Sequence, residues 1–394
     1  MKIKHTQFQG LFFVALTVLL FSPLSAKAEP NIQQLLEMMK AQQNQLDGMK
    51  AELKKAQETA RKAKSKADVT AASIPVLPKG FEFGGGMEIE STQSETYAGV
   101  DSSDVTLAKV EVYFDAQPND YLSTHVQMIY EDDGTDTISL DEAYAIIGNS
   151  EKTPMYLQAG KWAVPFGGYD TAMGTDPLTK TLGETAEAAL LVGYSKDGLT
   201  LEGYGYNGDT QQFDDDDEID QFGLHGSFET EVSGNTFSIG AGYLSNISDS
   251  GTITENVTGG TALADYVPGW EAHASLTTGP FVFYGGYMTA KDPFASGELA
   301  FNSQGAQPAA WNLETAYVTE IMNKETTLAV TMQASEEALA LSMPETRYGA
   351  SATVQMFPNY STTVEYLHDN DYSTSDGGTG KDGHTATLKI AAEF

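Results

Sequence analysis

The 394-residue sequence has no cysteine and little positive charge. The absence of cysteine excludes disulfides, thiolate zinc sites and a cysteine nucleophile. Its 22 Lys and Arg are outnumbered by 55 Asp and Glu, for a formal net charge of −33. This sign is wrong for binding phosphate backbones, so we expect no nucleic-acid partner. Six scattered histidines leave little for a histidine metal site, and we expect neither a metal nor a cofactor.

Long apolar runs are absent beyond the N-terminus. Leu11–Phe21 is apolar apart from one threonine, follows Lys2 and Lys4, and precedes the small-residue site Ala26–Ala28. These features predict a cleaved export signal over residues 1–28. An uncleaved membrane anchor is the alternative, but the run is short for a span. The remaining chain contains 38 Gly, 19 Tyr and 18 Phe, a composition typical of many short strands.

Residues 29–68 have the pattern of a coiled-coil helix. In a seven-residue frame, all but one of the a and d positions are apolar, and Lys, Gln and Glu lie between them. A single amphipathic helix lying on a neighbouring surface is the alternative. The a and d positions are Ile32, Leu35, Met39, Gln42, Leu46, Met49, Leu53, Ala56, Ala60, Ala63 and Ala67. Residues 69–80, which include Pro75 and Pro78, follow as a linker.

Residues 81–394 alternate between apolar and polar side chains in many short segments. In the last segment, the face from His384 to Phe394 is mostly apolar and the face from Thr385 to Glu393 mostly polar. This period of two predicts an all-β fold, and the length of the apolar faces favours membrane-spanning strands over a soluble sandwich. The expected strands are 81–91, 104–116, 120–132, 136–147, 154–163, 184–194, 198–206, 219–229, 235–247, 268–278, 281–291, 309–321, 325–335, 346–357, 360–371 and 383–394.

The connections between these sixteen strands alternate between short and long. Short turns such as Pro358-Asn359 occur at every second connection, and the others are mostly longer and rich in Gly, Asp, Ser and Thr. Short periplasmic turns and long external loops are the layout of an outer-membrane barrel. We therefore predict a 16-stranded antiparallel transmembrane β-barrel preceded by a periplasmic α-helical coiled coil. Its partners are the outer-membrane lipids and lipopolysaccharide of a Gram-negative bacterium.

The connection after the fifth strand is the main candidate for a solute site. Residues 164–183 are long for a surface hairpin, and a loop folded into the lumen would set the constriction and the charge selectivity. An ordinary external loop is an equally weighted alternative. The candidate substrate-binding or constriction residues are Lys161, Phe166, Tyr169, Asp170, Asp176, Lys180 and Glu184.

The same segment resembles the LbtU-type siderophore porins. The matching features are Gly160-Lys161 with Val164-Pro165-Phe166-Gly167, then Thr175–Thr179 and Gly183-Glu184-Thr185, behind an exported heptad helix. The resemblance implies a porin that takes up ferric siderophores without a plug domain. The acidic composition is at odds with an anionic ferric chelate unless the acids are paired or lie outside the pore.

Two classes of function remain open. The first is passive transport, either of ferric siderophores or as a general cation-preferring diffusion porin, because lumen acids concentrate cations. The second is a structural barrel that anchors a periplasmic coiled coil to the cell wall. We expect no enzyme: His225 and Ser227 point into the lumen by alternation, but without an orienting acid they are interpreted as polar lining. The seam and the porin layout predict a homotrimer.

Overall fold

The computed structural model describes residues 80–394 except 133–136, 150, 214–217 and 259–261. The predicted signal, the coiled coil and the linker up to residue 79 lie outside the described residues, as do most of the acids in the loops after the third and seventh predicted strands. None of the helices in the described part is both long and apolar enough to span a membrane.

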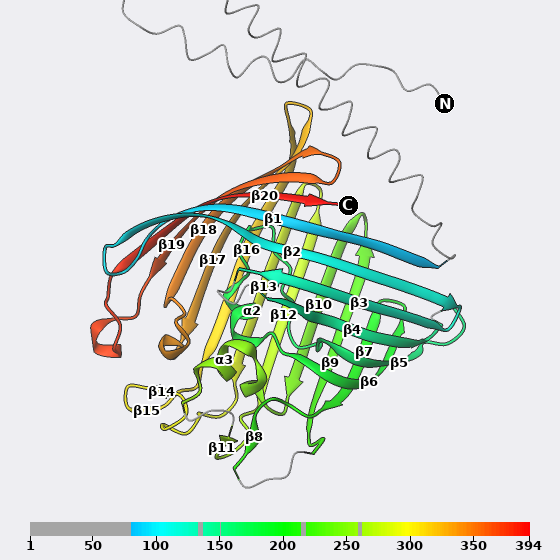
Figure 1. Ribbon diagram of the computed structural model, residues 1–394, viewed down its shortest axis with the longest axis horizontal. Coiled ribbons are helices and arrows are strands. Elements are labelled where there is room, and N and C mark those ends of the chain that lie inside the picture. The colour runs from blue at the N-terminus through cyan, green and yellow to red at the C-terminus, as the bar shows by residue number, and fades with distance from the viewer. Residues whose placement is uncertain (1–79, 133–136, 150, 214–217, 259–261) are drawn as a thin grey trace, which may run out of the picture. The chain divides into compact units, whose positions relative to one another are not determined.

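The described chain forms a closed antiparallel barrel in which each strand pairs with the next and the last pairs with the first (Figure 1). This confirms the predicted sixteen-stranded all-β fold. The strands are β1 (Phe81–Glu95), β2 (Asp101–Asn119), β3 (Leu122–Glu131), β4 (Ile138–Gly148), β5 (Met155–Ala163), β6 (Ala186–Lys196), β7 (Leu199–Tyr206), β9 (Gln221–Val232), β10 (Asn235–Leu244), β12 (Gly269–Thr278), β13 (Phe281–Ala290), β16 (Ala309–Ile321), β17 (Lys324–Glu336), β18 (Thr346–Phe357), β19 (Tyr360–Asn370) and β20 (Asp382–Glu393).

The first two strands extend further than the predicted segments 81–91 and 104–116. Their pairing continues to Glu95 opposite Asp101, through a stretch rich in Ser, Thr and Asp. Backbone hydrogen bonds hold a ladder together whatever the side chains are, so the hydrophobic pattern ends before the strand does.

The long connections contain short elements that the sequence did not predict. They are α2 (Leu178–Gly183), α3 (Gly251–Asn256), the two-stranded parallel sheet of β8 (Gln211–Gln212) and β11 (Ala262–Leu263), and the hairpin of β14 (Ala300–Phe301) and β15 (Gln304–Gly305). Figure 1 shows α2 within the barrel, whereas the other elements lie at one end of it, which we call the loop end.

Short turns close the opposite end, which we call the turn end. Met322 and Asn323 join the paired residues Ile321 and Lys324, and both turn residues have positive φ, 52° and 60°. Two successive residues of this kind make the turn that best matches strand twist. The alternation of short turns and long loops is therefore as predicted.

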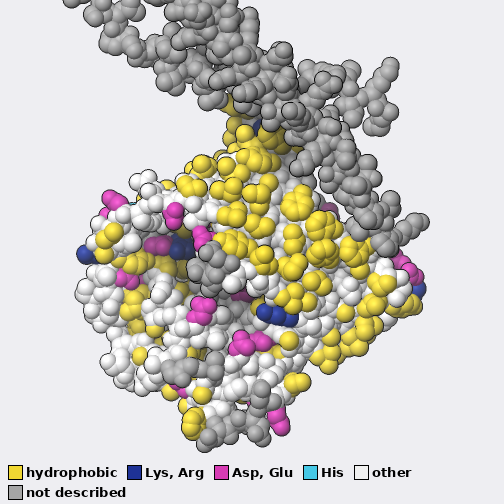
Figure 2. Space-filling view, in the orientation of Figure 1, with side chains coloured by type: hydrophobic (Ala, Val, Ile, Leu, Met, Phe, Trp, Pro, Cys, Tyr) yellow, Lys and Arg dark blue, Asp and Glu magenta, His cyan; other side chains and the backbone are white. Residues whose placement is uncertain are grey.

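The outward face of the barrel is apolar. Leu190, Leu224, Leu313, Val330 and Val364 are each 55–60% exposed, although they lie in the middle of regular strands. Figure 2 shows hydrophobic side chains gathered over the upper right of the surface, with few acidic side chains among them. An exposed apolar surface of this extent is unusual for a protein surrounded by water.

Aromatic side chains mark both ends of this apolar face. At the turn end, the Phe281 and Tyr317 ring centroids lie 5.0 Å apart. Nearer the loop end, Trp270 and Tyr287 are 5.2 Å apart. Outward-facing rows also contain Trp311, Tyr317, Tyr348 and Tyr366, as their exposed cross-strand neighbours show.

Candidate functional site

Residues 164–185, between β5 and β6, form what we call the lumen loop. Its ends are held together by the Val164 N–H, which donates to the Thr185 carbonyl at 2.8 Å. Between these ends the loop hydrogen-bonds to inward-facing side chains of β16, β17 and β19, on a part of the wall distant from β5 in the strand order. Of the two alternatives, the structure therefore shows the loop inside the barrel.

Two buried carboxylates hold the middle of the lumen loop. Glu314 on β16 accepts from the Thr171 hydroxyl at 2.6 Å and from the Ala172 N–H at 2.5 Å. Glu365 on β19 accepts from the Gly174 N–H at 2.6 Å. Both glutamates are at most 4% exposed. Because a buried carboxylate is costly without donors, these bonds keep the loop against the wall.

The helical part of the loop is fixed by polar and apolar contacts. The Leu178 N–H donates to the Gln333 side chain at 2.7 Å. Ser250 Oγ, from the connection after β10, donates to the Leu182 carbonyl at 2.6 Å. Leu182 itself is fully buried in a cluster of lumen-loop, loop-end and inward-facing strand residues. This cluster fills the interior beside the lumen loop with a hydrophobic core.

The rest of the lumen keeps a cavity of about 790 Å³ between the lumen loop and the opposite wall. Its charged lining consists of five carboxylates and four bases. They are Glu88, Glu90, Glu131, Asp176 and Glu393, with Lys109, Lys180, Arg347 and Lys389. A lining of nearly balanced charge contrasts with the strongly acidic composition of the chain.

Each of these four bases is held in an ion pair. Lys389 Nζ lies 2.9 Å from carboxylate oxygens of Glu88 and Glu90, and it also donates to the Gly174 carbonyl of the lumen loop at 2.9 Å. Arg347 Nε pairs with Asp369 at 2.8 Å. The ion pairs fix where positive and negative charges face the cavity, and the hydrogen bond from Lys389 to Gly174 joins the lumen loop to β20.

Three of the predicted site residues, Asp176, Lys180 and Glu184, form one cluster on the lumen loop. Lys180 Nζ lies 2.9 Å from Asp176 and 3.6 Å from Glu184. Burial alone would lower the pKa of Lys180, but the two carboxylates hold it above its ordinary value. Burial raises the pKa of Glu184, and Lys180 opposes that rise. The three residues also line a second cavity, of about 230 Å³, with Gly251 and Thr252 of the loop end.

The remaining predicted residues are dispersed. Phe166 is 1% exposed in the hydrophobic core, and the Tyr169 hydroxyl donates to its carbonyl. Asp170 is exposed. Lys161 pairs with Ala143 and Ala188, whose row faces outward. The structure thus places Phe166 and Tyr169 in packing roles and does not bring Lys161 together with the others.

The anchoring residues Glu314, Glu365 and Gln333 were not among the predicted site residues. Alternation marks each of them as inward-facing. Their contact with residues 171–178 depends on a closed barrel, because Glu365 and Gly174 are 191 positions apart. No local pattern in the sequence contains that information.

The sequence placed no orienting acid beside His225 and Ser227, and the structure changes this picture in one respect. His225 and Ser227 do face the lumen, and the structure supplies an acid, since Glu202 lies 2.9 Å from His225 Nδ1. Among the described residues, however, no hydrogen bond joins Ser227 to His225.

No protein-family model matches the chain. It is 29% identical over 332 residues to a UPF0422 protein of Coxiella burnetii, over 82% of this chain and 70% of the relative. It is 25% identical over 337 residues to a UPF0422 protein of Legionella pneumophila strain Philadelphia 1, over 74% of this chain. That alignment spans 62% of the Legionella relative, which is less than two thirds of its length.

Solved structures of outer-membrane proteins share the fold. The outer membrane channel DcaP of Acinetobacter baumannii superposes with a TM-score of 0.54 at 13% identity, over 80% of this chain and 97% of that one. OprB of Pseudomonas putida gives 0.53 at 10% identity, over 80% and 94%. OmpF of Salmonella typhi, in a complex with daunomycin, gives 0.52 at 15%, over 80% and 97%. At these identities the similarity establishes the barrel architecture.

Proposed function

We propose that this protein is a channel for small solutes in the outer membrane of a Gram-negative bacterium. The observation on which this rests is the lumen loop, held across the interior by Glu314 and Glu365 while a charged cavity of about 790 Å³ stays open beside it. A barrel that serves only as an anchor has no need of such a charged cavity. The apolar outward face and its two aromatic ends support the membrane location.

Planar-bilayer recordings on the refolded protein test the proposal directly. We expect stepwise ion conductance, because the cavity beside the lumen loop provides a water-filled path. The alternative, a barrel that anchors a coiled coil, predicts membrane insertion without conductance. Insertion is measured separately, by the shift in electrophoretic mobility of the folded barrel on heating, so a silent bilayer with correctly folded protein would refute the channel.

The carboxylate excess supports a preference for cations. The nearly balanced charges that line the cavity include Glu131. The inward-facing row of β2 adds two further acids, Glu111 and Asp115. The preference should be marked at low salt and weaker at high salt, since the Debye length falls from about 10 Å at 0.1 M to about 3 Å at 1 M. Anion preference would contradict the general cation-preferring porin and would suit an anionic ferric chelate better.

Uptake of ferric siderophores is the finer proposal, and it rests on the resemblance of residues 157–194 to the siderophore porins. The ion-paired bases Lys109, Arg347 and Lys389 support it, because their paired acids repel an anionic chelate less than free acids do. A deletion strain grown on defined ferric siderophores tests it. If the deletion strain grows as well as the wild type on every siderophore while the purified protein conducts ions, siderophore uptake is excluded and the general porin is retained.

We also propose that residues 29–68 form a periplasmic coiled coil that supports a homotrimer. Polar substitutions at Leu46 and Leu53 should weaken the assembly, because each buried leucine contributes roughly 1.5–3 kcal/mol. Sedimentation of the double variant and the wild type in detergent measures the effect. Identical sedimentation coefficients would exclude a role for the seam.

A further inference from the structure

Two of the six histidines lie close together on the inner wall of the barrel, although they are 48 positions apart. His225 on β9 and His273 on β12 have nearly parallel rings, 10° between planes, with centroids 5.9 Å apart. Glu271 completes the group: one potential ligand atom from each residue lies within 4.8 Å of the others. We call these three residues the His-His-Glu cluster.

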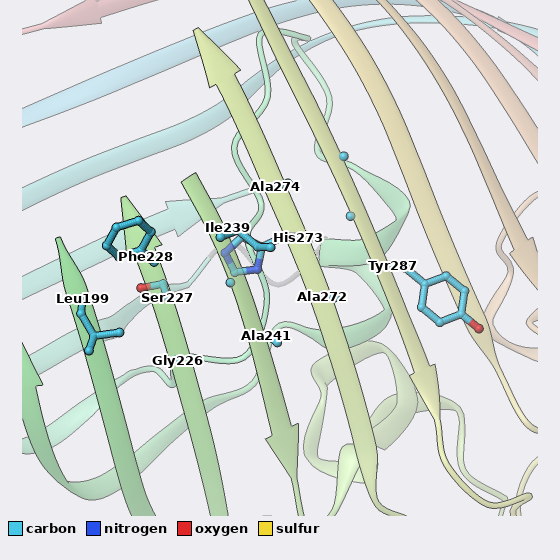
Figure 3. A pocket seen from close by; sticks show the side chains of 13 residues that line it. Leu199, Gly226, Ser227, Phe228, Ile239, Ala241, Ala272, His273, Ala274 and Tyr287 are labelled. Atoms are coloured by element: carbon cyan, nitrogen blue, oxygen red, sulfur yellow. The ribbon is translucent and has the colours of Figure 1, made fainter. Parts of the chain in front are cut away.

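Glycines on the intervening strand make room for the cluster. In the strand register, Gly242 of β10 lies between His225 and Glu271, and Gly240 lies beside His273. A Cβ on Gly242 would lie 2.8 Å from Glu271 Oε1, and one on Gly240 would lie 2.3 Å from His273 Cε1. The side chains from β12 therefore extend over β10 towards β9. Figure 3 shows the His273 ring in this position over β10.

One atom of the cluster lacks a partner. Glu271 is 2% exposed, and its Oε2 lies 2.9 Å from His273 Nδ1. Its Oε1 has no hydrogen-bond partner among the described residues. A buried carboxylate oxygen without a donor is costly, and most such atoms in proteins are satisfied by a donor, a water or an ion. The unpartnered oxygen is therefore available to a cation.

The surroundings of His225 are those of a metal ligand. Its Nδ1 lies 2.9 Å from Glu202 Oε2, and Glu202 Oε1 accepts from the Tyr156 hydroxyl at 2.6 Å. When Nδ1–H donates to Glu202, the lone pair of Nε2 is left available. Carboxylates that bind the second ring nitrogen in this way orient metal-ligating histidines and raise their basicity.

We propose that His225, His273 and Glu271 bind a divalent transition-metal cation of the zinc class. Two imidazoles and one carboxylate suit Zn²⁺ and its first-row neighbours, whereas Mg²⁺ and Ca²⁺ prefer all-oxygen sets. Three protein ligands leave a fourth position for water or a solute on the lumen side. Glu202 is a positioning residue. The proposal does not depend on the channel function.

The test is Zn²⁺ titration of the refolded full-length chain, without a histidine tag, in detergent. We expect one Zn²⁺ per chain. His225→Ala, His273→Ala and Glu271→Gln should each weaken binding at least about tenfold, and Glu202→Gln about 10–100-fold, the range found for groups behind a ligand. Glu271→Gln preserves the shape of the side chain, so its loss of affinity does not reflect a collapsed site.

Two matched controls use other histidines. His125 also faces the lumen and pairs with a carboxylate, Asp115, at 2.8 Å, so His125→Ala should bind Zn²⁺ like the wild type. His368 and His384 have Nδ1 atoms 3.1 Å apart on the outward face, and the double variant His368→Ala/His384→Ala removes that competing pair. It too should keep one Zn²⁺ per chain.

Three results would overturn the proposal. The first is that folded wild-type protein binds no Zn²⁺. The second is that folded His225→Ala/His273→Ala binds Zn²⁺ with unchanged affinity. The third is that only the outward-face double variant loses Zn²⁺ binding. Folding of each variant is checked by its mobility shift on heating. Absorption by bound Co²⁺ in the visible range, present in the wild type and lost in Glu271→Gln, gives a second readout that does not depend on affinity.

Discussion

The interior of the barrel has two sides that share the same alternating strand pattern but differ in packing and in access to water. On the filled side, the inner faces of β5–β13 are covered by the lumen loop and by residues of the loop end. Tyr206, Leu191 and Met288 are each 1% exposed there. On the open side, those inward residues of β1–β3 and β17–β20 that the lumen loop leaves uncovered line the cavity of about 790 Å³ and present ion-paired charges. Alternation alone therefore does not decide whether an inward position becomes core or channel lining.

The position of the lumen loop separates the two sides. Where the loop and the loop-end elements cover the wall, inward side chains lose contact with water and must pack or form hydrogen bonds. Where they do not, charged side chains such as Lys109 and Lys389 keep access to water and pair with nearby acids. Four predictions test this division, in order of decreasing effect.

The largest effect should come from releasing the lumen loop. Glu314→Ala/Glu365→Ala removes the acceptors for residues 171–175, so the loop should leave the wall and the passage should widen. Because the constriction limits ion flow, we expect single-channel conductance to rise about twofold or more. Glu320→Ala/Glu325→Ala, an exposed cross-strand pair at the turn end, removes the same charge and should leave conductance nearly unchanged. Equal conductance in both variants would place the constriction elsewhere.

Next in size is the packing of the filled side. Gly193 faces inward under the Tyr156 ring, and a Cβ there would lie 2.1 Å from Tyr156 Cζ, while the Tyr156 hydroxyl is held by Glu202. Gly193→Ala should destabilise the barrel by about 1–3 kcal/mol, the usual cost of overpacking. Gly203→Ala on the adjacent strand meets only an ordinary contact of 3.4 Å. Urea unfolding in detergent compares the two, and equal midpoints would show that the tyrosine moves freely.

A moderate effect is expected on the selectivity of the open side. Asp170→Asn/Asp176→Asn/Glu184→Gln removes three acids from the lumen loop and should reduce cation preference at low salt, because fewer fixed charges attract cations. The reversal potential in a salt gradient measures this. Replacing three exposed acids at the turn end is the matched control. An unaltered reversal potential would mean that these acids lie outside the ion path.

The smallest effect concerns pH and the loop-end residues beside the filled side. Burial raises the pKa of Asp249 to about 6, although its Oδ1 accepts from the Thr210 N–H at 2.8 Å. The ordinary value is about 4, so the folded state binds this proton more tightly than the unfolded state. The stabilisation of the folded state by the proton on Asp249 is therefore complete below about pH 4 and is lost as the pH rises to about 6.

Limited proteolysis of the connection between β10 and β12 measures this loss. Cleavage should become faster between pH 4 and pH 6 and then level off. Asp249→Asn should remove the pH dependence, whereas Asp265→Asn, exposed in the same connection, should retain it. A slope that persists in Asp249→Asn would assign it to another group.

Much of the fold was predictable because the barrel repeats one local rule. Sixteen alternating segments, and short turns at every second connection, defined the strands and their order. The site was predicted less completely. Asp176, Lys180 and Glu184 came together because each is four residues from the next, which places their side chains on one face of successive helical turns. Lys161 did not join them, because its row faces outward.

The sequence by itself indicated which side chains face inward, because successive side chains of a strand point to opposite faces of the sheet. It also determined the apolar outward face and the acidic balance of the chain. Only the tertiary structure decided that residues 164–185 enter the lumen, that Glu365 holds Gly174, and that His225 meets Glu271 over Gly242. These contacts join residues tens to hundreds of positions apart, and strand pairing together with closure of the barrel brings them together.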